Sequence, residues 1–194
     1  PVLRNVVAAG TLTAFSGYAA VIWVPIYLVR IHELGTGEAG TYLALTIGAG
    51  GAIGIYLGGR LADYLGEKYG EQWLAWVVTI AGLLSIPFMF LCFFASTAGM
   101  AILAYSLPAF MGTIYVACSF ALIQNHTPLE MRSVCAAINL FIMNIIGLGL
   151  GPFTIGLFSD VFASSMGVDA LRYALLVTLV AIAFGSWFYY RTGV

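Results

Sequence analysis

The stretch Gly58–Gly70, GGRLADYLGEKYG, separates two long apolar runs and holds Arg60, Asp63, Glu67 and Lys68. These are four of only fifteen charged residues, seven basic and eight acidic, in a chain of 194 residues. Charged residues make up 8% and hydrophobic residues 62%, whereas a soluble domain carries about 25% charged residues. Fifteen charges cannot cover the surface of a soluble fold of this size. The composition predicts an all-α membrane protein in which this stretch is a loop between two spans.

The same composition argues against several other classes. A net charge of −1 gives no electrostatic footprint for nucleic acid. The three cysteines, Cys92, Cys118 and Cys135, lie inside apolar runs without metal-ligand spacing, so we expect packing residues and neither disulfides nor a metal site. His32 and His126 are predicted to be interfacial residues at opposite membrane faces. No metal or organic cofactor is expected.

Six apolar runs reach the length of about 20 residues that a membrane-spanning helix needs. Their approximate ranges are 3–30, 38–58, 72–95, 98–124, 129–157 and 168–190. The connections between them are short, so neighbouring helices should be antiparallel. Thr127-Pro128-Leu129-Glu130 predicts an N-cap at the start of the fifth span, and Ser96 or Thr97 is expected to cap the fourth.

Basic residues indicate the orientation, because Lys and Arg are enriched on the cytoplasmic side. With six spans, both termini share one side with the second-to-third and fourth-to-fifth connections. That side carries five cations and the other carries two: Arg4, Arg60, Lys68, Arg132 and Arg191, against Arg30 and Arg172. The excess predicts an integral multi-pass protein with both termini in the cytoplasm.

A short internal repeat supports a two-part organisation. Gly59–Asp63 closes the second span and Gly156–Asp160 closes the fifth, 97 residues apart, with the shared pattern Gly-x-(Leu/Phe)-(Ala/Ser)-Asp. The two spans run in opposite directions. The pattern therefore predicts an inverted 3+3 repeat of units at about 1–97 and 98–194, an architecture of secondary transporters.

The stretch GGRLADYLGEKYG also resembles the loop motif of the major facilitator superfamily, Gly-x-Leu-Ala-Asp-Arg-x-Gly-Arg-Lys. The matching residues are Gly59, Leu61, Ala62, Asp63, Gly66 and Lys68; Tyr64 and Glu67 depart from it, where the family usually has cations. In that family the motif lies on the cytoplasmic side, between the second and third helices of each six-helix half. The resemblance implies that residues 1–194 form one half of a twelve-helix transporter.

The fifth span and its exit resemble the eleventh helix of spinster-like transporters within this superfamily. The match is carried by Asn144, Gly147, Gly149, Leu150, Gly151, Pro152, Gly156, Leu157, Ser159 and Asp160, followed by Ala-Leu-Arg at 170–172. It implies the C-terminal half, with the N-terminal half, absent from this chain, as its partner. The opening at Pro1 likewise suggests a piece of a longer protein. The implied substrate is a lysolipid or a phosphorylated sphingoid base, exported with a proton as coupling ion.

The charged stretch has a chemistry of its own. Gly59 allows close approach of two helices, Gly66 permits a tight turn, and the carboxylate of Asp63 can face the positive end of a helix dipole. We hypothesise a cytoplasmic latch in which Asp63 meets Arg132 at the start of the fifth span, with Lys68 part of the same gating motif. The alternative is a solvated loop with ordinary cytoplasmic charge.

Two glycine tracks are predicted to bring helices close together. Gly50, Gly54 and Gly58 recur every four residues on the second span, and Gly147 and Gly151 do so on the fifth. Static packing and sliding between states are both compatible with them. Pro152 is expected to kink the fifth span, because it removes a backbone hydrogen bond.

Polar side chains within the spans are the candidate substrate contacts. Tyr105, Tyr115 and Ser119, together with Pro108 and Gly112, share one face of the fourth span. The remaining cavity candidates are Tyr18, Trp23 and Tyr27 on the first span and Asn139 on the fifth, whereas Asn144 is assigned to helix packing. For each aromatic residue, a lipid-facing or interfacial position is the open alternative.

No Asp, Glu, Lys or Arg lies deep in any predicted span. The proton carrier and any headgroup-binding arginine are therefore expected in the N-terminal half, and the wall described here suits an amphipathic tail. We predict alternating-access transport of a lipid-like substrate; the alternative is a drug or small-metabolite exporter of the same superfamily. A channel would need a polar pore and an enzyme a nucleophile–base pair or metal cluster, neither of which the spans offer. A scaffold role is left open.

Overall fold

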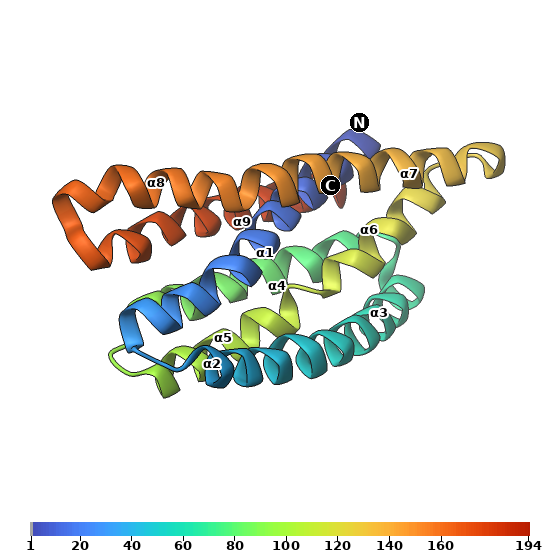
Figure 1. The fold of residues 1–194 in the computed structure, drawn as a ribbon. Helices are drawn as coiled ribbons and strands as arrows, with labels where there is room; N and C mark the ends of the chain where they lie inside the picture. Colours follow the sequence, from blue (N-terminus) through green and yellow to red (C-terminus); the bar gives the residue numbers. More distant parts are fainter. Residues whose placement is uncertain (1) are drawn as a thin grey trace.

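Long apolar segments form long helices in the computed structural model, which describes residues 2–194 (Figure 1). The first half contains α1 (Val2–His32), α2 (Thr36–Leu43), the π-helical turn η1 (Ala44–Ala49), α3 (Gly50–Tyr69) and α4 (Gln72–Phe93). The second half contains α5 (Ala98–Met111), α6 (Ile114–Asn125), η2 (Leu129–Met131), α7 (Arg132–Ile142), the π-helical η3 (Met143–Leu150), α8 (Gly151–Met166), η4 (Gly167–Asp169) and α9 (Ala170–Thr192).

Within residues 2–194, five helical segments are long and apolar enough to cross a membrane. They are Val2–His32, Thr36–Tyr69, Gln72–Phe93, Ala98–Asn125 and Leu129–Thr192. The last segment, of 64 residues, contains the predicted fifth and sixth spans. It turns back at Gly167, whose φ of 57° favours glycine, so that α8 and α9 lie side by side (Figure 1).

The charged stretch is helical, which corrects the predicted loop. The helix that begins at Gly50 runs through it to Tyr69 and ends at Gly70, where φ is 106°. Arg60 donates to the Tyr56 hydroxyl at 2.9 Å and Lys68 approaches that of Tyr64 at 3.5 Å, both four residues apart along the helix. Such pairs stabilise an exposed helix end.

Three other local expectations are corrected. Gly66 lies inside α3 and the tight turn falls at Gly70. The fifth span continues to Met166 and does not end near residue 157. The Thr127 hydroxyl donates back to the Ile123 carbonyl at 2.6 Å and does not cap the next helix, which begins as a 3₁₀ turn at Leu129.

The predicted cap of the fourth span is confirmed at Thr97. Its hydroxyl accepts a hydrogen bond from the Met100 amide at 3.3 Å, and its backbone is extended. This is the standard N-cap arrangement, in which a side-chain oxygen satisfies one of the free amides of the first turn.

In the bundle, α1 packs against α9, η3, α8 and α6, and α9 also packs against α4. α3 lies beside α4, α5 and α6. Figure 1 places the start of α1, the end of α3, the start of α7 and the end of α9 at one end of the bundle, which we call the Asp63 end. The end of α1, the α4–α5 connection and the turn between α8 and α9 lie at the opposite end, which we call the Arg172 end.

Glycines allow the closest contacts between helices. A Cβ at Gly147 would lie 2.9 Å from that of Ala14, and one at Gly151 would lie 2.6 Å from the Phe15 carbonyl oxygen. On α3, added Cβ atoms would collide with Phe110 at Gly54 and with Ile114 at Gly58. Gly50 has open space around it, whereas a Cβ at Gly51 would lie 3.3 Å from the Thr113 methyl group. The contact track on α3 therefore runs through Gly51 and not Gly50.

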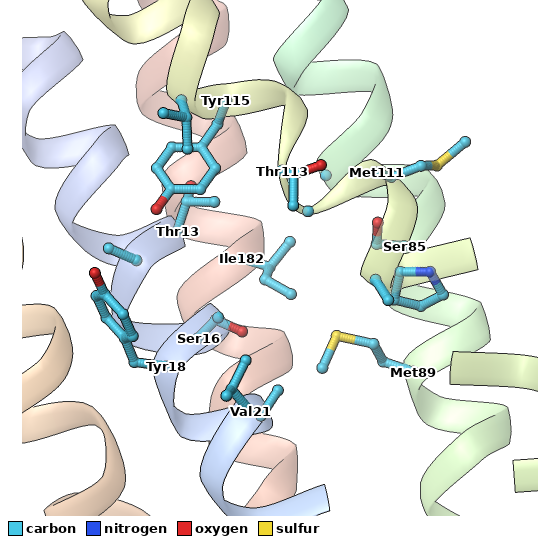
Figure 2. A pocket seen from close by; sticks show the side chains of 18 of the residues that line it. Thr13, Ser16, Tyr18, Val21, Ser85, Met89, Met111, Thr113, Tyr115 and Ile182 are labelled. Atoms are coloured by element: carbon cyan, nitrogen blue, oxygen red, sulfur yellow. The ribbon is translucent and has the colours of Figure 1, made fainter. Parts of the chain in front are cut away.

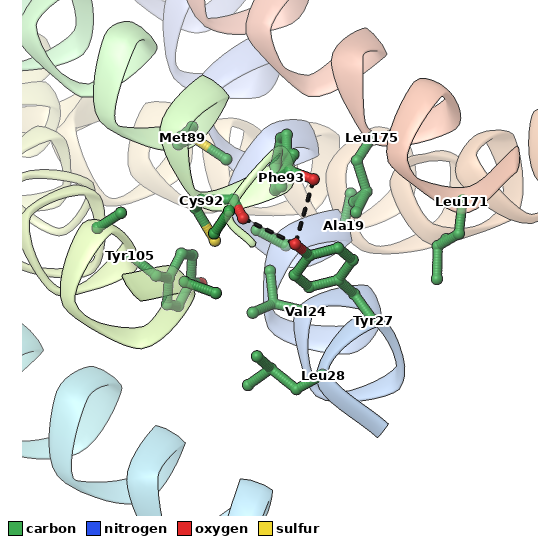
Figure 3. Packing of buried hydrophobic residues seen from close by; sticks show 14 of the residues in the cluster. Ala19, Val24, Tyr27, Leu28, Met89, Cys92, Phe93, Tyr105, Leu171 and Leu175 are labelled. Carbon is green, nitrogen blue, oxygen red and sulfur yellow. Dashed lines mark hydrogen bonds between the residues drawn. The ribbon is translucent and has the colours of Figure 1, made fainter. Parts of the chain in front are cut away.

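Two buried clusters form the core, one toward each end. The cluster at the Arg172 end surrounds Tyr27 with Leu28, Phe93, Leu171 and Leu175 (Figure 3). The cluster at the Asp63 end includes Val6, Ala75, Leu122, Ile123 and Tyr189. Members of both clusters contribute to the cavity described next, so the packed core is interrupted between them.

Candidate functional site

A cavity of about 250 Å³ lies between α1, α4, α5, α6 and α9 (Figure 2). Its wall is mostly apolar, and none of the described residues that line it is charged. The polar residues of the wall are Thr13, Ser16, Tyr18, Ser85, Tyr105, Thr113, Tyr115 and Ser186. The cavity therefore combines an apolar surface with a few neutral hydrogen-bonding groups, as small-molecule sites commonly do.

The first helix, α1, contributes one side of the cavity. Thr13, Ser16, Gly17 and Val21 recur at three- and four-residue steps, so they share one face of the helix. The Thr13 hydroxyl donates to the Ala9 carbonyl at 2.9 Å. This helix thus presents small and polar groups to the cavity beside α9, with which it packs.

Gly82, Ser85 and Met89 of α4 and Ile182 and Ser186 of α9 contribute the opposite side. A Cβ at Gly82 would collide with the Ser186 hydroxyl, so glycine is what allows these two helices to meet beside the cavity. The Ser85 hydroxyl donates to its own helix, to the Ala81 carbonyl at 2.7 Å.

The predicted fourth span is broken beside the cavity. α5 ends at Met111 and α6 begins at Ile114. Pro108, which has no amide hydrogen, lies in the last turn of α5, and the Gly112 amide donates to its carbonyl at 2.7 Å. The Thr113 hydroxyl lies 2.9 Å from the Phe110 carbonyl and 3.1 Å from that of Gly51. Interrupted helices at membrane depth are tolerated where they are buried in protein or line a cavity.

Three of the seven predicted cavity residues line this cavity: Tyr18, Tyr105 and Tyr115. Tyr105 of α5 is buried in the cluster at the Arg172 end. Tyr18 donates its hydroxyl to the side-chain oxygen of Asn144 at 3.3 Å. Pro108 and Gly112, which share the predicted face of the fourth span, also belong to the wall.

The other four candidates lie outside the lining. Ser119 is buried against the Tyr189 hydroxyl, to which it is hydrogen-bonded. Tyr27 is buried at the Arg172 end, and its hydroxyl donates to the carbonyls of Cys92 and Phe93 at 2.8 and 3.1 Å (Figure 3). Trp23 donates its indole N–H to the Pro152 carbonyl at 2.9 Å. Their roles in substrate contact stay predictions.

The two asparagines of the fifth span have exposures opposite to those their assigned roles suggest. Asn139, assigned to the cavity, is fully buried, and its amide nitrogen lies 3.1 Å from the Met143 sulfur. Its side-chain oxygen has no hydrogen-bond partner within residues 2–194. Asn144, assigned to packing, is exposed and bonded to Tyr18. The residue that contacts a cavity side chain is thus Asn144.

The predicted gating residues are spread along the Asp63 end. Asp63 is exposed, and no ion pair joins it to Arg132 within the described part of the chain. Arg132 instead donates to the Thr127 carbonyl at 3.3 Å, and a Cβ at Gly59 would make ordinary contact with Ala117 at 3.8 Å. Lys68 lies over the rings of Tyr64 and Tyr69. The latch is not formed in this conformation and stays a prediction.

Sequence reasoning missed the contributions of α4 and α9 and most of that of α1. The missed polar residues are Thr13, Ser16, Ser85, Thr113 and Ser186. A signal was available in the small and polar residues at helical spacing, Gly82–Ser85–Met89 and Ile182–Ser186. The spans containing them are apolar on every side, so no polar stripe stood out. Among the described residues, no group of three His, Cys, Asp or Glu side chains is arranged to hold a metal ion.

Comparison with known proteins places this geometry in a family context. No protein-family model matches the chain. An MFS-type efflux pump of Mycolicibacterium smegmatis (strain ATCC 700084 / mc(2)155) is 34% identical over 182 residues, which cover 94% of this chain and 42% of the pump.

The fold is similar to two crystal structures of a bacterial homologue of the human lysosomal transporter Spinster. The inward-facing, occupied structure has a TM-score of 0.86 at 20% identity, over 99% of this chain and 49% of that one. The inward-facing, unoccupied structure has a TM-score of 0.87 at 21% identity, over 100% of this chain and 47% of that one. The chain therefore has the fold of these transporter structures, is similar in sequence to an MFS-type efflux pump, and spans about half the length of these relatives.

Proposed function

We propose that this chain is the C-terminal half of a twelve-helix secondary transporter and works by alternating access against an N-terminal half. The relatives extend to about twice its length, which supports a missing partner half. The reversal at Gly167 supports counting α8 and α9 as separate spans, making six. Those six then divide into inverted units at about 1–97 and 98–194, with Gly59 and Gly156 at corresponding positions.

The orientation proposed is with both termini in the cytoplasm. The helix ends that carry Arg4, Arg60, Lys68, Arg132 and Arg191 gather at the Asp63 end, whereas Arg30 and Arg172 belong to the opposite end. An excess of five cations against two supports a cytoplasmic Asp63 end.

We assign to the transporter an amphipathic, lipid-like substrate such as a lysolipid or a phosphorylated sphingoid base. The observation that carries this assignment is the cavity, whose wall joins apolar side chains to neutral hydroxyl groups without a charge. Such a wall fits an alkyl tail better than a sugar or an ion. The proton carrier and the cation for an anionic headgroup are assigned to the N-terminal half.

A drug or small-metabolite exporter of the same superfamily is the second candidate. The observation that favours it is the sequence relative, which is described as an efflux pump and is more similar in sequence than the Spinster homologue, at 34% against 20–21% identity. A largely apolar cavity also accommodates hydrophobic drugs.

Flux through the complete transporter in sealed liposomes tests the two candidates. The substrates are a phosphorylated long-chain amine, a lysophospholipid and a cationic dye, each with and without an imposed proton gradient. Movement of the lipids and not the dye, faster with the gradient, is the expected result. Movement of the dye alone would keep the fold and replace the substrate assignment by the exporter.

A cavity variant shows whether this half takes part in binding. Tyr115→Ala should lower lipid flux at limiting concentration about five- to thirty-fold, the range for truncating an aromatic anchor. Tyr190→Ala, at an exposed position of α9, is the matched control and should leave flux unchanged. Equal fluxes for the two variants would remove the cavity from the substrate path.

A further inference from the structure

The Ser16 hydroxyl is buried without a hydrogen-bond partner. The residue is 2% exposed, and its side-chain oxygen has no partner within residues 2–194. Two other hydroxyls of the wall are bonded to their own helices, Thr13 to Ala9 and Ser85 to Ala81. Among the described residues of the wall, Ser16 has the one side-chain oxygen that is both fully covered and unpaired, and an orphaned buried hydroxyl in a native protein calls for an explanation.

A second serine of the cavity wall is buried and makes no side-chain hydrogen bond within residues 2–194, although its oxygen, unlike that of Ser16, is not fully covered. Ser186 of α9 is 3% exposed and lies with its oxygen against Gly82. Its hydroxyl makes none of the hydrogen bonds found among residues 2–194, although its backbone carbonyl faces Thr79 at 3.4 Å. Two helices that pack against each other, α1 and α9, thus each bring one free hydroxyl to the cavity.

The position of Ser16 directs its hydroxyl to the cavity. Figure 2 shows the side chain on the side of α1 that faces Ile182 and Met89. The oxygen is covered in this conformation, and rotation about the Cα–Cβ bond changes the direction in which it points. A ligand that enters the cavity can therefore supply the missing partner.

The neighbouring groups restrict the chemistry of that ligand. Thr13 and Ser85 already donate their protons to backbone carbonyls, so they can only accept. Ser16 and Ser186 can both donate and accept. No described residue of the wall carries a charge to compensate an ionic group, and burying an unpaired charge is strongly unfavourable. The fitting group is neutral.

We infer that this cavity recognises an uncharged hydrogen-bonding group, a hydroxyl or an ester or amide carbonyl, attached to an alkyl chain, through Ser16 and Ser186. Val21, Met89 and Ile182 beside them hold the adjoining methylene groups. The inference rests on the proposed transport of amphipathic molecules and makes it more specific. The hydroxyls select among lipids by the neutral segment between headgroup and tail, while the headgroup is bound elsewhere.

Two lipids with the same headgroup and chain length distinguish this inference from the proposed transport of amphipathic molecules in general. A lysophosphatidylcholine carries a glycerol hydroxyl and an ester, whereas an alkylphosphocholine of equal chain length carries neither. Affinity for each is measured by binding to the complete purified transporter, and flux is measured in liposomes. The wild-type protein should bind the lysolipid more tightly than the alkylphosphocholine, by about two- to ten-fold, the range for one or two neutral hydrogen bonds.

Ser16→Ala and Ser186→Ala should each lower lysolipid affinity by about two- to ten-fold and leave alkylphosphocholine affinity unchanged. Ser106→Ala is the matched control, because that hydroxyl is outside the cavity and donates to the Ile102 carbonyl at 2.8 Å. The thermal midpoint of ligand-free Ser16→Ala protein should not fall, since no bond is lost in the empty cavity. A lowered midpoint would contradict the unpaired hydroxyl.

Two results would overturn the inference in distinguishable ways. In the first, the variants bind both lipids as the wild type does and both lipids are still transported. The hydroxyls of Ser16 and Ser186 then do not contact the substrate, and the inference fails while the proposed lipid transport is kept. If neither lipid binds or moves and the cationic dye does, the proposed substrate class and this inference fail together.

Discussion

The two ends of the helix bundle hold their polar side chains in different ways. At the Arg172 end, the Tyr27 hydroxyl of α1 reaches the last carbonyls of α4, those of Cys92 and Phe93. The Arg172 guanidinium of α9 lies 5.9 Å from the centre of the Tyr27 ring, and its Nε is 3.1 Å from the Asp169 carboxylate. These contacts join α1, α4 and α9 at this end.

At the Asp63 end, charged side chains make most of their contacts within single helices, whereas the buried hydroxyls of Ser119 on α6 and Tyr189 on α9 bond between helices. Arg60 bonds Tyr56, Lys68 approaches Tyr64, and Arg191 lies 5.2 Å from the ring of Trp187, each pair four residues apart. Between elements, His126 approaches Glu71 at 3.5 Å. Asp63 itself is exposed to solvent.

The difference indicates where this bundle is held rigidly and where its charges are exposed. Hydrogen bonds that cap a buried helix end restrict movement between the helices they join, because breaking them leaves carbonyls unsatisfied. Exposed charges on separate helices carry no such restriction. We therefore expect substitutions at the Arg172 end to affect stability, and those at the Asp63 end to affect conformational balance.

The largest effect is expected for Tyr27→Phe. The change removes the donor shared by the Cys92 and Phe93 carbonyls, in a residue that is fully buried. The free energy of unfolding should fall by about 1–3 kcal/mol, the range for buried groups left unsatisfied. Denaturant unfolding of the complete transporter in mild detergent measures it.

Tyr42→Phe provides the control for that prediction, because Tyr42 is 42% exposed on α2 and an exposed substitution usually changes stability by less than about 0.5 kcal/mol. Equal stabilities for the two variants would mean that the hydrogen bonds of Tyr27 do not hold α1 to α4.

A smaller effect is expected for Asp169→Asn at the same end. The Arg172 side chain is 20% exposed and that of Asp169 is 60% exposed, so solvent screens the pair. The loss should be about 0.2–1 kcal/mol. Combined with Tyr27→Phe, the two losses should not add, because Arg172 contacts both residues. Additive losses in the double variant would show that the two contacts act independently.

The sequence predicted the helices of this fold better than their ends. Apolar runs and the Thr97 cap located the spans because both signals are local. Thr97 and Thr127 look alike in sequence, yet the Thr127 hydroxyl bonds back to Ile123, a choice that depends on the backbone of the preceding helix. The continuation of α3 to Tyr69 was missed because charge marks where a helix leaves the membrane and not where it ends.

The sequence predicted residues of the cavity wall mainly on the fourth span, where polar and small residues follow an interpretable pattern. Tyr105 and Tyr115 share a face with Pro108 and Gly112, and all four line the cavity. Ser119 continues the same face but lies beyond the cavity, against Tyr189, because the pattern gives direction around a helix and not depth along it. The hydroxyls of α1 and α9 depend on which neighbour each helix meets, and that is tertiary information.

The smallest effect on stability is expected for Asp63→Asn, at the other end of the bundle. Asp63 is exposed and has no ion pair within residues 2–194, so the free energy of unfolding should change by less than about 0.5 kcal/mol. If Asp63 pairs with Arg132 in another conformation, as the latch hypothesis states, losing the charge disfavours that conformation alone. A surface ion pair contributes up to about 1 kcal/mol, which corresponds to about a five-fold change in the ratio of inward- to outward-open molecules.

Distances between spin labels on the two ends of the complete transporter measure that ratio. Glu67→Gln is the matched control, because Glu67 is exposed on the same helix, one turn from Asp63. A shift in the ratio for Asp63→Asn and none for Glu67→Gln would support the latch. An unchanged ratio for both variants, with unchanged stability, would leave Asp63 an ordinary solvated charge, and the contrast between the two ends would then be one of packing alone.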